Sequence, residues 1–208
     1  MNITPYLIPA DAVVSEEEIK KSRFITYLAH TPGVESAKAF VADIKARHGD
    51  ARHNCWAFVA GRPDDSMSWG FSDDGEPSGT AGKPILAQLT GSGVGEITAV
   101  VTRYYGGIRL GTGGLVKAYG GGVQQALTKL ATNEKAITVQ FTLSCEYPHI
   151  ALIESILASH NAVQVNTEFS HNVLMTVEVD ARSADQIASE IFNRTRGQVS
   201  ATGLDNKS

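Results

Sequence analysis

The stretch that decides the fold is Val100–Gly122, which reads VVTRYYGGIRLGTGGLVKAYGGG. Its first residues continue a predicted β-strand that begins at Ile97, in which one set of side chains faces each way. The two alternating sets are Ile97, Ala99 and Val101, and Thr98, Val100 and Thr102. Eight of the 20 glycines in the chain fall in this stretch, and glycine lets a backbone take positive φ and approach another surface closely. A helical apolar period begins at Leu115, after Thr112. The stretch is therefore predicted to be a strand, a glycine-rich turn and a helix.

Such a turn can form an anion site, because the first N–H groups of a helix have no partners within it and the helix dipole favours negative charge there. Arg109 and Lys117 add positive charge. The spacing matches neither G-x-x-x-x-G-K-[ST] nor a G-x-G-x-x-G that opens a helix, so a purely structural turn stays an alternative. The residues expected to contact a ligand are Arg103, Tyr104, Tyr105, Gly106, Gly107, Arg109, Gly111, Thr112, Gly113, Gly114 and Lys117.

A second loop, the acidic loop, lies upstream at residues 72–84 and carries three carboxylates within four residues. Such a cluster can bind a divalent cation, but its spacing is not that of an EF-hand, and we expect no metal and no other cofactor. Long glycine-rich loops often carry function. The possible second loop of the site therefore comprises Asp73, Asp74, Glu76 and Lys83.

The composition is that of an ordinary globular protein of one large or two small domains: the chain has 208 residues, 42% of them hydrophobic. The N-terminus, MNITPYLIPADAVVSEEE, is acidic and short of apolar residues, so we expect no signal peptide and no membrane segment. The two cysteines, Cys55 and Cys145, form neither a disulfide framework nor a zinc pattern. These observations predict a cytoplasmic protein.

The acidic excess is confined to one part of the chain. Residues 136–208 carry 4 basic and 8 acidic side chains, whereas residues 1–135 carry 14 of each. A domain that binds nucleic acid through its phosphates is expected to be basic. The C-terminal part is therefore a poor candidate for nucleic-acid binding, and the first part has only a local basic cluster.

The fold class is predicted to be α+β, with a first domain at residues 1–132, a polar linker at Thr132–Lys135, and a second domain at residues 136–205. In the second domain, alternating strands and helical apolar stripes follow the order βαββαβ, with a last strand at Gln198–Thr202, which is the ferredoxin-like unit. In the first domain we predict the following elements: strands near Ala12–Ser15 (with a helical turn at Ser15–Glu18 as the alternative), Arg23–His30, Asn54–Gly61 and Met67–Phe71, and helices at Val34–His48, from Pro84, and from Thr112 to about Ala131.

His53 and Cys55 lie two residues apart on one face of the apolar strand. One interpretation is a Cys–His nucleophile pair, as in a cysteine hydrolase; the other is a buried thiol near a hydrogen-bonded histidine. A thiol in a continuous apolar strand stays protonated and inert, so we predict that Cys55 is not a nucleophile and assign no catalytic residue.

Two long motifs also carry a resemblance. TRYYGGIRLGTGGLVKAY at residues 102–119, preceded by SDDGEPSGTAGKPIL at residues 72–86, resembles the signature of the bacterial members of the IMPACT family. The resemblance extends over nearly the whole chain. It implies a first domain that is an α/β sandwich similar to the second domain of the fifth small-subunit ribosomal protein, and a second domain similar to the last domain of elongation factor G.

The resemblance also implies a role in translation, because eukaryotic members of the family regulate it through a protein partner. The leading hypothesis is a non-enzymatic protein that binds RNA or the ribosome, with a protein partner in translation control as a further expectation. The alternative is an enzyme or binder of a small phosphorylated ligand at residues 106–114, which would need a general base or metal supplied by the acidic loop. Whether the acidic loop comes within reach of Arg103 discriminates between the two.

Overall fold

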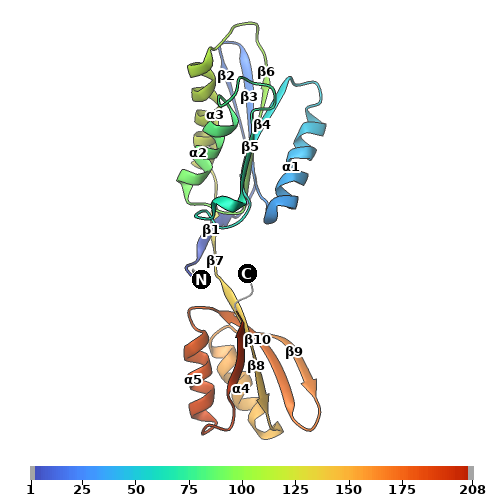
Figure 1. Cartoon of the computed structure of the whole chain (residues 1–208), viewed down its shortest axis with the longest axis vertical. Helices are drawn as coiled ribbons and strands as arrows, with labels where there is room; N and C mark the ends of the chain where they lie inside the picture. The colour runs from blue at the N-terminus through green and yellow to red at the C-terminus, as the bar shows by residue number, and fades with distance from the viewer. Residues whose placement is uncertain (1–2, 206–208) are drawn as a thin grey trace. The chain divides into compact units, whose positions relative to one another are not determined.

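The computed structural model describes residues 3–205 and divides the chain into two compact units (Figure 1). The first unit is Tyr6–Lys135; the second comprises residues 136–205 together with residues 3–5. The predicted mixed α/β architecture is confirmed. Among the helices of the described residues, none is long and apolar enough to cross a membrane.

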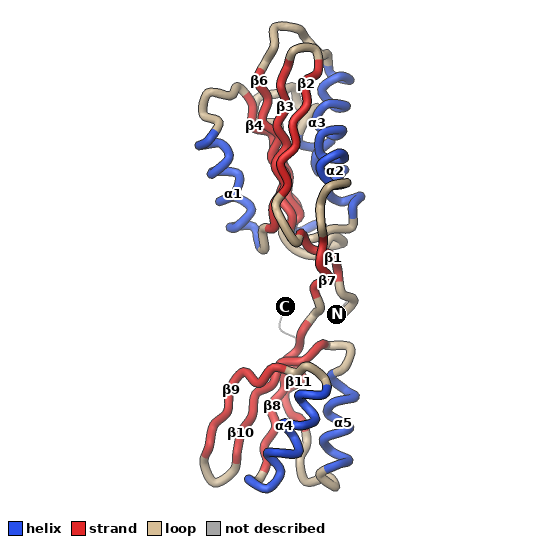
Figure 2. Tube along the Cα trace, turned by 180° about the vertical axis from the view of Figure 1, so that it is seen from behind, coloured by secondary structure: helices blue, strands red, loops and turns tan. Residues whose placement is uncertain are grey.

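The first unit is built on a five-stranded antiparallel sheet of order β2-β3-β6-β4-β5. Helix α1 covers one face, and helices α2 and α3 cover the other (Figure 2). The bounds of these elements are β2 Val13–Ile19, β3 Ser22–His30, α1 Gly33–Arg47, β4 His53–Val59, β5 Trp69–Ser72, α2 Gly82–Ser92, β6 Ile97–Tyr104 and α3 Thr112–Leu127.

Strand β6 lies in the middle of the sheet, and its alternate residues face the helices on opposite sides. Val101 packs in the core beneath α2 and α3, whereas its neighbour Val100 packs against α1. Both side-chain sets are buried because the strand lies mid-sheet with helices on both faces. The next residue on the Val101 face is Arg103, so the arginine is directed toward α3 and not toward solvent.

Some of the predicted elements differ from the observed ones. Residues Ser15–Glu18 belong to strand β2 throughout, so the alternative helical turn is wrong. Met67 lies in a short 3-10 helix, Ser66–Ser68, just before β5. Helix α3 ends at Leu127, short of the predicted end near Ala131.

The predicted linker Thr132–Lys135 is instead strand β7, which pairs antiparallel with β1, Tyr6–Pro9. Its sequence, TNEK, has no apolar residue, so pattern reasoning cannot detect it. Backbone pairing and the buried carboxylate of Glu96 stabilise this two-stranded sheet. Glu96 accepts hydrogen bonds from Tyr6 Oη at 2.8 Å and from Lys135 Nζ.

The second unit follows the predicted element order βαββαβ, on an antiparallel sheet of order β11-β8-β10-β9. Alternate residues of β8 and β10 pack with the apolar stripes of α4 and α5, which lie on one face of the sheet (Figure 2). The last strand lies slightly later than predicted. The bounds are β8 Thr138–Cys145, a 3-10 turn Tyr147–His149, α4 Ile150–Ser159, β9 Val163–Phe169, β10 Val173–Asp180, α5 Ala184–Arg194 and β11 Ala201–Asp205.

Candidate functional site: a basic cleft at the start of helix α3

The first unit contains a cleft of about 440 Å³ where β6 passes through the glycine-rich turn into α3. Three arginines, a histidine, a glutamate and a tyrosine converge on it from β4, β6, the acidic loop and the turn. Among the predicted site residues, the cleft brings together Arg103, Tyr105, Arg109, Gly111, Thr112 and Glu76. The remaining residues along its wall are Arg52, His53, Pro77, Leu110 and Leu115.

The glycines of the turn fix its path. Gly107 and Gly111 have φ of +86° and +74°, which is left-handed backbone that favours glycine. A Cβ on Gly106 would lie 1.8 Å from the carbonyl oxygen of Lys21 in the β2–β3 turn. Gly111 is the N-cap of α3 and has no side chain to occupy the first N–H groups of the helix. The helix therefore presents these N–H groups beside the cleft, where an anion is favoured.

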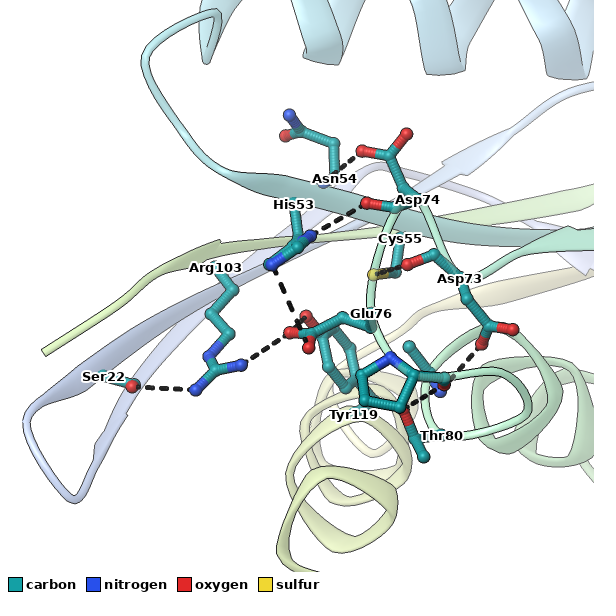
Figure 3. Close-up of polar contacts among 12 residues, drawn as sticks. Ser22, His53, Asn54, Cys55, Asp73, Asp74, Glu76, Thr80, Arg103 and Tyr119 are labelled. Carbon is teal, nitrogen blue, oxygen red and sulfur yellow. Dashed lines mark hydrogen bonds and ion pairs between the residues drawn. The ribbon is translucent and has the colours of Figure 1, made fainter. Parts of the chain in front are cut away.

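Arg103 forms the buried wall of the cleft instead of an exposed ligand contact. Its side chain is only 7% exposed, and Nη1 donates to Glu76 Oε1 at 2.6 Å (Figure 3). Nη2 donates to Ser22 Oγ at 3.3 Å. The sequence leaves open a second role for Arg103, an internal ion pair with Asp73 or Asp74 of the acidic loop. The structure corrects the partner to Glu76.

The adjacent tyrosines face opposite ways, as expected for strand neighbours. Tyr105 is 45% exposed and lies along the cleft, with the Arg103 guanidinium 5.5 Å from its ring centre. Tyr104 is directed to the other side, where its hydroxyl lies 2.7 Å from His48 Nδ1 and donates to Asp50 Oδ1 at 3.0 Å. Tyr104 is therefore placed outside the cleft.

The three carboxylates of the acidic loop point in different directions (Figure 3). Asp73 accepts from the backbone N–H groups of Gly79, Ala81 and Gly82 at 2.8–3.0 Å, and so caps helix α2. Burial works to raise the pKa of Asp73, but these donors outweigh it and hold the pKa below its usual value. Asp73 is thus structural.

Asp74 is also structural, because its carboxylate accepts from Lys45 Nζ at 2.5 Å and from the backbone N–H of Asn54 at 2.7 Å. Only Glu76 reaches the cleft. Its Oε1 accepts from Arg103 and from the Tyr119 hydroxyl at 2.8 Å. No three metal-ligating side chains gather anywhere in residues 3–205.

Other predicted site residues lie away from the cleft. Lys117 lines a separate depression between β2 and α3, together with Glu17. Lys83 is exposed in the first turn of α2. Gly106, Gly107, Gly113 and Gly114 shape the turn and the start of the helix but do not line the cleft.

Sequence reasoning missed Arg52 and did not connect His53 with the anion site. His53 lies opposite Arg103 in the pairing of β4 with β6, which places both at one end of the sheet. The available signal was the two-residue spacing of His53 and Cys55. It puts His53 on the sheet face covered by α2 and α3, but only the strand order shows that β4 neighbours β6.

Cys55 is fully buried beneath the cleft, and its Sγ donates to the backbone carbonyl of Asp73 at 2.9 Å. Burial raises the pKa of this thiol to about 12, so it is protonated at neutral pH. The thiolate is the nucleophilic form, and the hydrogen bond directs the sulfur into the protein.

We therefore expect that iodoacetamide labels Cys55 of the native protein very slowly at neutral pH. Peptide mass spectrometry after timed quenching measures the rate, and labelling in urea shows that the thiol is competent once exposed. Labelling of native Cys55 as fast as that of the unfolded chain would contradict this prediction.

Comparison with known proteins agrees with these motifs. Residues 20–127 match the Impact N-terminal domain, and residues 143–198 match a domain of unknown function, DUF1949. The chain is 56% identical over 200 residues to the IMPACT family member YigZ of Escherichia coli (strain K12), covering 96% of this chain and 98% of YigZ. It is 51% identical over 194 residues to an IMPACT family member of Haemophilus influenzae, covering 93% and 94% of the two chains.

A solved structure is also similar over the full length. It is a crystal structure of a hypothetical protein, with a TM-score of 0.77 and 54% sequence identity, and the match covers 99% of this chain and 100% of the other. The family model spans more than half of the chain, and the sequence relatives match nearly all of it. The chain therefore belongs to the IMPACT family.

Proposed function

We propose that the first unit binds RNA through the cleft at the start of α3 and that the protein acts, without catalysis, on translation. The observation that carries this proposal is the convergence of Arg52, Arg109 and the N-terminus of α3 around one cleft beside the exposed ring of Tyr105. Guanidinium groups bind phosphate in a forked geometry, and exposed aromatic rings stack on bases.

The charge of the cleft supports an anionic ligand. Arg103 is neutralised by Glu76, whereas Arg52 and Arg109 are exposed and have no ion-pair partner among residues 3–205. These two arginines give the cleft a local positive charge in a unit whose basic and acidic side chains are equal in number. The second unit, with its acidic excess, is not proposed to contact the RNA backbone.

The link to translation comes from the family. The proposed likeness of the first unit to the second domain of the fifth small-subunit ribosomal protein, and of the second unit to the last domain of elongation factor G, favours RNA or the ribosome as the partner. A cytoplasmic location and a protein partner in translation control belong to the same proposal.

One observation favours a second candidate, a small phosphorylated ligand at the same cleft. The acidic loop does reach Arg103, through Glu76 at 2.6 Å, and His53 lies beside it. A carboxylate and an imidazole beside an anion site can act as general acid and base on a bound small phosphate ester. Binding of a mononucleotide that does not strengthen when the ligand is lengthened to an oligonucleotide would support this candidate over RNA.

The test of the RNA proposal is the salt dependence of binding to a single-stranded RNA of about 12 nucleotides. Arg109→Ala and Arg52→Ala are each expected to weaken binding by roughly tenfold. Each variant should also reduce the slope of log K against log salt by about 0.7, the value for one lost contact with a single strand. Filter binding at several salt concentrations measures both quantities.

Lys117→Ala is the matched control, because it removes the same charge from helix α3 but outside the cleft. We expect its binding curves to follow those of the unaltered protein. The proposal fails if the two arginine variants bind RNA with the same affinity and salt slope as Lys117→Ala.

A further inference from the structure

The floor of the cleft holds two polar atoms that face each other without touching. His53 Nε2 and Glu76 Oε2 are 4.0 Å apart, and Figure 3 shows both side chains directed toward the same space. This separation is too long for a direct hydrogen bond. Both side chains line the cleft and are largely buried, at 15% and 4% exposure.

The orientation of the imidazole is fixed by its other nitrogen. His53 Nδ1 lies 2.9 Å from the backbone carbonyl oxygen of Asp74. A carbonyl oxygen only accepts hydrogen bonds, so Nδ1 carries a proton. Nε2 is therefore the atom that meets a ligand: it is an acceptor when the ring is neutral and a donor when the ring is charged.

Within the described residues, only one of the two carboxylate oxygens of Glu76 accepts hydrogen bonds. Oε1 accepts from Arg103 Nη1 and from the Tyr119 hydroxyl, whereas Oε2 takes part in no hydrogen bond within residues 3–205. This oxygen belongs to a side chain that lines the cleft, so it can accept a hydrogen bond from a ligand held there.

We propose that the gap between His53 and Glu76 holds the 2′-hydroxyl of a ribose and thereby selects RNA over DNA. This inference rests on the proposed binding of RNA at the same cleft. An oxygen can lie within hydrogen-bonding distance of both atoms at once, because their separation of 4.0 Å is less than twice a normal hydrogen-bond length. The hydroxyl donates to Glu76 Oε2 and accepts from Nε2–H of His53 when the imidazole is charged.

The chemistry of the floor favours a hydroxyl over a phosphate oxygen. The open carboxylate oxygen of Glu76 repels an anion but accepts from a hydroxyl, while Arg52 and Arg109 take the phosphate along the cleft wall. In RNA the 2′-hydroxyl and the phosphate lie on the same nucleotide, so one nucleotide meets both parts. The 2′-hydroxyl is the group by which proteins distinguish RNA from DNA.

The experiment compares three oligouridylates of about 12 nucleotides that have identical sequence and charge: RNA, 2′-deoxy and 2′-O-methyl. The full-length protein is expected to bind the RNA about tenfold more tightly than the 2′-deoxy oligonucleotide at the same salt concentration. The 2′-O-methyl oligonucleotide should bind no better than the deoxy one, because its oxygen accepts hydrogen bonds but cannot donate to Glu76. These ligand changes require no altered protein.

Protein variants separate the ribose contact from the phosphate contact. His53→Ala should bring the ratio of RNA to DNA affinity close to one while keeping the salt slope, and its tryptophan fluorescence verifies that the first unit is folded. Arg109→Ala should weaken RNA and DNA equally and leave the ratio unchanged. Equal binding of RNA and DNA by the unaltered protein would overturn this inference alone, whereas failure to bind any of the oligonucleotides would overturn the proposed function with it.

Discussion

Arg103→Met is expected to lower the free energy of unfolding of the first unit by about 3–5 kcal/mol, the usual cost of removing one partner from a buried ion pair. The substitution leaves the Glu76 carboxylate, 4% exposed, with only the Tyr119 hydroxyl as a hydrogen-bond donor within the described chain. A buried charge without its partner is far more costly than a lost surface contact.

Intrinsic fluorescence during urea unfolding measures this effect on the relevant part of the molecule. The chain has two tryptophans, Trp56 and Trp69, and both lie in the first unit. The second unit contributes no tryptophan signal, so its unfolding does not mask the transition. Lys117→Ala serves as the control for losing a positive charge at the surface, and it should change the unfolding free energy by less than about 0.5 kcal/mol.

A double variant tests whether the cost comes from the unpaired charge. Arg103→Met combined with Glu76→Leu removes both charges, and replacing both partners of a buried pair by apolar residues is often near neutral. We expect the double variant to be more stable than either single one, with a coupling energy of about 2–3 kcal/mol. A loss of stability below about 1 kcal/mol for Arg103→Met would contradict the buried pair.

The fold was predictable where the pattern is local. The strand, turn and helix around Val100–Gly122, and the alternating strands of the second unit, follow from periods of two and 3.6 that tertiary contacts do not alter. Strand β7 was not predictable, because its four polar residues are held by pairing with β1 and by Glu96, both distant in sequence.

The candidate site was predictable only in the part that lies along one stretch of chain. Arg109, Tyr105 and the start of α3 follow β6 directly, so the sequence itself places them together. Arg52 and His53 reach the cleft because β4 pairs with β6, which no local pattern indicates.

Arg103 shows the limit of pattern reasoning most clearly. The alternation along β6 predicts that Arg103 shares a face with Val101, but it does not tell which face the helices α2 and α3 cover. A carboxylate of the acidic loop was the expected alternative partner, and the loop does supply it. The choice of Glu76 depends on how the loop folds once Asp73 caps α2 and Asp74 binds Lys45.

Gly106→Ala is expected to destabilise the first unit by about 3 kcal/mol, as an overpacked buried contact does. The added Cβ would lie 1.8 Å from the carbonyl oxygen of Lys21 and 2.0 Å from its carbonyl carbon. These are backbone atoms, so no side-chain rotation relieves the contact, and the β2–β3 turn must move. Urea unfolding followed by tryptophan fluorescence measures the loss.

Gly121→Ala is the matched control for this substitution, since it adds the same methyl group within α3, where nothing lies within 4 Å of the new atom. Replacing a mid-helix glycine by alanine raises helix stability by about 1 kcal/mol, so the two variants should shift the unfolding midpoint in opposite directions.

Displacing Lys21 also displaces its neighbour Ser22, which accepts hydrogen bonds from Arg103 Nη2 and from the backbone N–H of Gly106. Gly106→Ala should therefore weaken RNA binding even where the protein stays folded, because the wall of the cleft moves with the turn. Equal unfolding midpoints for Gly106→Ala and Gly121→Ala would show that the turn tolerates a side chain at residue 106 and would remove the close packing of the two turns as the reason for glycine there.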